Sequence, residues 1–112
     1  MEEAIEIIKK HYGIQNPFLR TRKREYCECR WMIWYYLRFT SKRRYNVREI
    51  GKVFKLDYTT VVDGTKTFKN LLETEPELRM KQVEIENEIR LTINRKIRAE
   101  RQIHRKGQEI HC

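Results

Sequence analysis

Residues that could carry acid–base or nucleophilic chemistry are few in this 112-residue sequence, and they are scattered. The three histidines, His11, His104 and His111, lie near the two ends of the chain. We find no nucleophile–base pair around them and no pair of carboxylates in an apolar stretch. The four glycines are too far apart to form a phosphate-binding loop. The sequence therefore predicts a protein that is not an enzyme and has no catalytic residues.

Cysteines can ligate metals or form disulfides, and the sequence has three, Cys27, Cys29 and Cys112. Together with His104 and His111 they could supply four zinc ligands, but their spacing matches no common zinc module. Cys27 and Cys29 also lie in a helical pattern, where residues i and i+2 face different directions. We therefore expect semi-buried thiols, no metal and no cofactor, in a reduced intracellular setting.

Basic residues are by far the commonest residues that could do chemistry here, and their chemistry is the neutralisation of phosphates. The formal net charge is +9, and residues 18–55 hold twelve basic and three acidic residues. Such clustering is typical of a protein that binds a polyanion, and a merely solubilising surface is the alternative explanation. The candidates for phosphate contact are Arg22, Lys23, Arg24, Lys42, Arg43, Arg44 and Arg48.

A group of polar residues after the basic stretch could contact base edges. Thr59 and Thr60 carry a methyl and a hydroxyl that suit thymine methyls and base acceptors, and Lys66 lies farther along. Asp57 could accept a hydrogen bond from a cytosine amino group, but we favour an N-cap role, in which the backbone occupies its side-chain oxygen. With Tyr58 between them, these residues complete the predicted DNA-binding set.

Helices must position these residues, because the apolar spacing is helical and no segment has a convincing strand pattern. A first helix is expected over residues 4–12 and is ended by Gly13. A basic loop over residues 20–24 then leads to an aromatic-rich helix over residues 25–39. We expect that helix to be the main core helix.

Four aromatic or apolar side chains near this helix have predicted environments. Phe18 and Leu19 are expected to reach into the core. Trp31 and Tyr35 are the aromatic residues of the core helix that we expect to be partly exposed.

Two further helices are predicted after a basic connector over residues 40–45. Asn46 and Glu49 have the spacing of a capping box, which opens a helix over residues 47–54. That helix should bury Val47, Ile50 and Phe54.

A short turn follows, and Asp57 begins a helix over residues 58–72. Its buried stripe is expected to be Val61, Thr65, Phe68 and Leu72. A short helix, a turn and a longer helix make a helix-turn-helix, whose second helix can place its N-terminus in the major groove of duplex DNA. The predicted fold class is therefore all-α.

These residues also resemble a known family. Arg20-Thr21-Arg22-Lys23-Arg24, Glu49-Ile50-Gly51 and Asp57-Tyr58-Thr59-Thr60-Val61, together with Leu19, Glu25, Arg30 and Phe54, are similar in order and spacing to the C-terminal DNA-binding domain of the bacterial replication initiator DnaA. The resemblance covers about residues 3–80 and does not include an ATPase module. It implies a helix-turn-helix in the major groove, with residues 22–24 in the adjacent minor groove. It also implies that residues 57–60 face bases or phosphates, although Tyr58 stands where the family has histidine.

The chain beyond this resemblance forms a second predicted region. We expect residues 1–75 to form the DnaA-like domain and residues 76–112 to form a basic helical extension, helical from about residue 77 to 105. Three arrangements of the extension are open: its first part packs back on the domain and the remainder frays, it forms a homodimer or binds a protein partner, or it lies on DNA. In the last arrangement the contacts come from Arg90, Arg95, Lys96, Arg98, Arg101, Arg105 and Lys106.

The sequence thus predicts a double-stranded DNA-binding protein of replication-origin or transcription control, of the kind a phage or mobile element encodes. The alternative is an adaptor or inhibitor that kept the fold and binds a replication or transcription protein. No apolar run reaches the roughly 20 residues of a membrane span, and acidic residues replace the cationic start of a secretory signal. We therefore expect a location in the bacterial cytoplasm or nucleoid, with no membrane partner and no small-molecule substrate.

Overall fold

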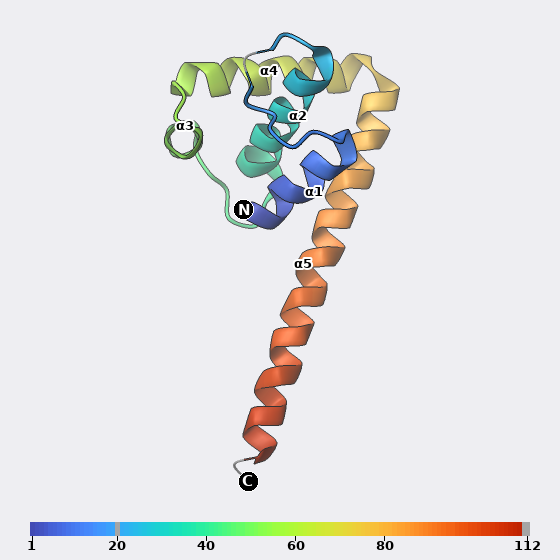
Figure 1. The fold of residues 1–112 in the computed structure, drawn as a ribbon. Helices are drawn as coiled ribbons and strands as arrows, with labels where there is room; N and C mark the ends of the chain where they lie inside the picture. Colours follow the sequence, from blue (N-terminus) through green and yellow to red (C-terminus); the bar gives the residue numbers. More distant parts are fainter. Residues whose placement is uncertain (20, 111–112) are drawn as a thin grey trace.

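The computed structural model describes residues 1–19 and 21–110, with side chains described up to residue 99. Within these residues the fold is all-helical, as predicted, and it contains no strand (Figure 1). Its elements are α1 (Glu2–Tyr12), α2 (Arg24–Tyr35), the π-helix η1 (Tyr36–Thr40), α3 (Val47–Phe54), α4 (Tyr58–Thr74) and α5 (Pro76–Ile110). None of the described helices is both long and apolar enough to cross a membrane.

The first helix ends where its sequence predicts. Gly13 adopts a left-handed conformation with φ of 64°, and its N–H donates to the carbonyl of Lys10 at 3.1 Å. This is the common glycine cap of a helix C-terminus. Ala4 and Ile8 face the core.

The core helix differs from its prediction at both ends. It begins at Arg24 rather than at residue 25, so Arg24 belongs to a helical turn and not to the basic loop. From Tyr36 it continues as a π-helix, closed by a hydrogen bond of 2.9 Å from the Ser41 N–H to the Tyr36 carbonyl. Trp31 and Tyr35 are partly exposed, as expected.

The prediction for Leu19 is wrong, since it is 51% exposed, whereas Phe18 does reach inward. Phe18 stacks on Phe54 with 4.6 Å between ring centroids. Residues 17–19 form a turn and a bend, and with Pro17 buried and Phe18 stacked on Phe54 the chain leaves the core at Leu19.

The capping box at α3 is confirmed. The Asn46 side chain accepts from the Glu49 N–H at 2.9 Å, and the Glu49 carboxylate accepts from the Asn46 N–H at 3.3 Å. Of the three predicted core residues of α3, only Ile50 is fully buried, while Val47 and Phe54 are half-buried. The short length of α3 leaves its two ends at the edge of the core.

The connection between α3 and α4 is tight. A Cβ on Gly51 would lie 2.7 Å from the Leu56 carbonyl oxygen, so only glycine fits there without a shift. Lys55 takes a left-handed conformation with φ of 56°. The predicted buried stripe of α4, Val61, Thr65, Phe68 and Leu72, is confirmed, and the helix runs two residues farther than expected, to Thr74.

The first part of α5 packs back on the domain, as one of the three predicted arrangements states, but the remainder does not fray, and the helix runs past residue 105 to Ile110. Leu78, Ile85 and Ile89 are buried in the same core as residues of α1, α2 and α4. His11 of α1 is half-buried and bonds Glu88 of α5, and Lys96 pairs with Glu3 at 2.5 Å. Residues 76–90 therefore share the core of residues 1–75, and α5 continues beyond the body (Figure 1).

Candidate nucleic-acid interface

The N-terminal tip of α4 is exposed. Asp57, Tyr58, Thr59 and Thr60 all lie at the surface, while Val61 behind them is fully buried. In Figure 1, α4 forms one edge of the body, and its first turn lies beside α3. The buried stripe thus fixes the helix and leaves its first turn accessible to a ligand.

Asp57 holds the N-cap position, but its side chain makes no capping hydrogen bond. The expectation that the backbone occupies this carboxylate is therefore wrong. The first turn is instead closed by the Thr60 N–H, which donates to the Asp57 carbonyl at 3.1 Å. The Asp57 carboxylate remains available to accept from a partner such as a cytosine amino group.

A cation–π contact joins the two helices at this tip. The Arg48 guanidinium lies 5.4 Å from the centroid of the Tyr58 ring, and Tyr58 is 47% exposed. Arg48 belongs to the first turn of α3 and Tyr58 to that of α4. The contact places a positive charge of α3 beside the exposed threonines.

The basic segment, described at residues 19 and 21–23, lies between contacts near the two ends of α4. At one end Phe18 stacks on Phe54, the last residue of α3, and at the other end Arg24 pairs with Glu75, which follows α4, at 2.5 Å. Figure 1 accordingly shows the segment at the edge of the body that α4 forms.

Arg30 of α2 holds the backbone of this segment. Its guanidinium donates to the Leu19 carbonyl at 3.1 Å and to the Thr21 carbonyl at 3.3 Å. From the sequence, Arg30 is one basic charge and part of the family resemblance, and no structural contact is predicted for it. Its position within an aromatic core helix is the feature of the sequence that could have predicted this structural contact of Arg30.

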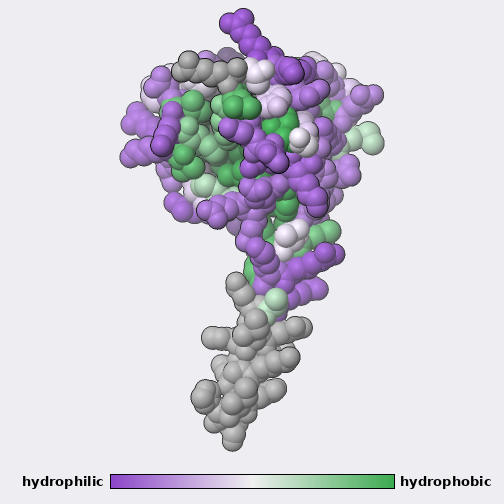
Figure 2. Space-filling view, viewed as in Figure 1, coloured by the Kyte–Doolittle hydropathy of each residue, from purple (hydrophilic) through white to green (hydrophobic). Residues whose placement is uncertain are grey.

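The three basic residues at the end of this segment differ in their partners. Arg24 is bound by Glu28 at 3.1 Å and by Glu75, and the bond to Glu75 is the main cause that raises the pKa of Arg24. Arg22 and Lys23 are exposed and have no acidic partner among the described side chains. Hydrophilic side chains predominate along this edge in Figure 2.

The connector after η1 lies elsewhere. Lys42 and Arg43 border Met1 and Ala4 at the start of α1, and Figure 1 shows the connector beside the N-terminus, on the side of the body away from α4. Arg43 pairs with Glu49 at 3.2 Å and lies over the Tyr45 ring at 4.6 Å. The structure thus groups Arg22, Lys23, Arg48, Lys66 and residues 57–60 on the α4 side and separates Lys42 and Arg43 from them. Arg44 is exposed on the same connector.

The two described cysteines are thiols, one half-buried and one buried. The Cys27 sulfur contacts the Arg30 guanidinium at 3.0 Å, and burial raises the pKa of Cys29 to about 12. Within the described part of the chain no cluster of three or more potential ligands could hold a metal ion. The side chains of His104, His111 and Cys112, the other zinc candidates, lie outside the described residues, as do those of Arg101, Arg105 and Lys106.

Comparisons with protein-family models, curated proteins and solved structures find no match. The case for a function therefore rests on the exposed tip of α4 and the basic segment beside it.

Proposed function

We propose that this protein binds double-stranded DNA, with α3 and α4 acting as a helix-turn-helix whose second helix enters the major groove. The observation that carries the proposal is the joint placement of the exposed tip of α4 and the basic segment along one edge of the molecule. The similarity of residues 57–61 to the signature of the DnaA DNA-binding domain supports the same assignment.

Phosphate contacts supply most of the affinity in this proposal. Arg22, Lys23, Arg48 and Lys66 are exposed on the α4 side, and no described acidic side chain pairs with them. Each phosphate that a cation neutralises releases counterions, so the affinity falls steeply with salt.

Sequence preference comes from the tip of α4. Thr59 and Thr60 offer a methyl and a hydroxyl each, and Asp57 offers an acceptor. The family resemblance implies that residues 22 and 23 lie in the adjacent minor groove or on its phosphates when the tip lies in the major groove. In this proposal the protein acts in replication-origin or transcription control.

A selection from a random duplex pool tests the proposal. We expect an enriched sequence motif and an affinity that falls with salt along a slope of several phosphate contacts. Heparin serves as the control, because a sequence-independent polyanion competes for the cations and contains no base edges. Binding without any enriched motif would contradict the readout by α4. The absence of binding at moderate salt would favour the alternative, an adaptor or inhibitor that kept the fold.

A further inference from the structure

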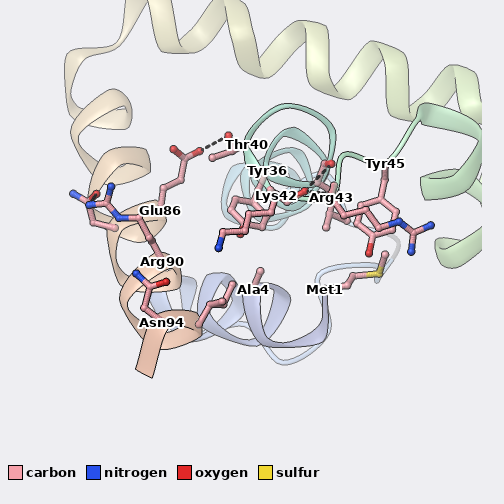
Figure 3. A pocket seen from close by; sticks show the side chains of 14 residues that line it. Met1, Ala4, Tyr36, Thr40, Lys42, Arg43, Tyr45, Glu86, Arg90 and Asn94 are labelled. Atoms are coloured by element: carbon pink, nitrogen blue, oxygen red, sulfur yellow. Dashed lines mark hydrogen bonds between the residues drawn. The ribbon is translucent and has the colours of Figure 1, made fainter. Parts of the chain in front are cut away.

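A pocket of about 370 Å³ opens on the side of the body away from α4 (Figure 3). It lies between the start of α1, the end of η1 with its connector, and the middle of α5. A DNA duplex bound at the α4 side would leave this pocket uncovered, so a ligand of the pocket can be tested independently of DNA binding.

The interior of the pocket is largely apolar. Ala4 and Leu37 are buried there, Tyr36 is 8% exposed, and Ile93 contributes from α5. Such a lining in a concave site of this size accommodates one or two apolar side chains of a ligand.

Lys42 supplies the available charge. Figure 3 shows its side chain reaching into the space between α1 and α5. Among the described side chains no carboxylate pairs with it.

Glu86, Arg43 and Arg90 also line the pocket, and of these only Arg43 has a partner of opposite charge among the described side chains. Glu86 accepts from the Thr40 hydroxyl at 3.1 Å and from the Gln82 amide at 2.9 Å. Arg43 is bound to Glu49, and the Arg90 guanidinium donates to Asn87 at 3.2 Å. Glu86 and Arg90 keep opposite charges, because their partners are neutral, so Lys42 makes the charge of the pocket positive and is the direct partner of an acidic ligand.

We propose that this pocket binds an acidic peptide segment of a partner protein, in which an apolar side chain enters the pocket and a neighbouring carboxylate pairs with Lys42. Charge complementarity selects the acidic segment, and the apolar interior selects the anchor side chain. A DNA duplex meets the charge requirement but not the second one, because its hydrated phosphates cannot fill an apolar pocket of this volume. The protein would therefore bind its partner on one side while the α4 side remains available.

Selection of random twelve-residue peptides displayed on phage, with the full chain as bait, tests the inference. We expect enrichment of peptides in which Asp or Glu flanks a Leu, Ile, Phe or Trp. Lys42→Glu should weaken binding of an enriched synthetic peptide at least about tenfold, since the new charge repels the carboxylate. Lys10→Glu, an exposed position on α1 outside the pocket, makes the same charge change and should leave peptide binding unchanged.

Three outcomes would overturn the inference. They are no enrichment, enrichment of basic or neutral peptides, and equal peptide binding by the Lys42→Glu and Lys10→Glu variants. A fourth arm adds octanoate to the ¹⁵N-labelled protein. If octanoate shifts the amide signals of residues 36, 42 and 93 whereas an enriched peptide does not, the site binds small apolar acids and the peptide assignment is wrong. DNA binding by the two variants should be equal, so failure of this inference is distinguishable from failure of the proposed function.

Discussion

Among single residues, two arginines that lie close in sequence have different environments. Arg24 bridges Glu28 and Glu75, whereas Arg22 is exposed with no described acidic partner. An arginine that already has carboxylate partners must give them up before it binds a phosphate, so it contributes less to net affinity. The available cations, rather than all the cations, should set the strength of DNA binding.

Substitutions at Arg22, Arg24 and Thr60 should have different effects. Arg22→Ala should weaken binding to every duplex and reduce the salt slope by about one. Arg24→Ala should have the smaller effect, because Arg24 must give up its pairs with Glu28 and Glu75 before it can bind a phosphate.

Thr60→Ala should cost about 1–3 kcal/mol on the selected site only. Fluorescence anisotropy on selected and random duplexes at several salt concentrations measures all three. Equal losses on both duplexes for Thr60→Ala would show that the threonine does not read bases.

Arg30 should act by positioning the basic segment rather than by its charge. Arg30→Lys keeps the charge but cannot span the Leu19 and Thr21 carbonyls, so we expect faster amide hydrogen exchange at residues 21–23. DNA affinity should fall several-fold with it, because a mobile segment loses entropy on binding. Unchanged exchange together with unchanged affinity would remove Arg30 from the interface argument.

Among the helices, the close approach of α2 and α4 depends on one position. A Cβ on Gly64 would lie 2.6 Å from Cζ3 of Trp34 and 2.9 Å from Cδ1 of Trp31. Glycine at this position therefore lets two tryptophan rings pack against the α4 backbone. This close approach of α4 to α2 accompanies the full burial of Val61 and Phe68 of α4.

Gly64→Ala should lower the free energy of unfolding by about 1–3 kcal/mol, because the added methyl overlaps large rings that have little room to move. Asn70→Ala is the control, an exposed position of the same helix, and should change stability by no more than about 0.5 kcal/mol. Urea unfolding followed by circular dichroism measures both variants. Equal stability of the two variants would mean that the tryptophans shift freely.

For the whole molecule, α5 closes the core, and the body presents two different surfaces. Ile85 and Ile89 are fully buried, and α5 packs on both α1 and α4. The α4 side carries the basic segment and the exposed threonines, and the other side carries the apolar pocket with Lys42. This arrangement suits a protein that holds DNA on one side and a protein partner on the other.

Two neighbouring substitutions should distinguish the faces of α5. Ile89→Ala should destabilise the fold by about 2–5 kcal/mol, since it leaves a cavity in the shared core. Leu91→Ala, at a position that is 53% exposed, should change stability by less than about 1 kcal/mol. Chemical unfolding checks the pair. Similar values for both would mean that residues 1–75 are stable without α5.

The amino-acid sequence by itself determined the local structure. The glycine end of α1, the capping box of α3 and the buried stripe of α4 all follow from interactions between residues a few positions apart, which helical geometry makes predictable. The tertiary structure decided which charged residues remain available. Glu75 lies 51 residues from Arg24, and Met1 and Ala4 border Lys42 across the fold. Contacts between such distant segments depend on how the helices pack, and no local pattern encodes them.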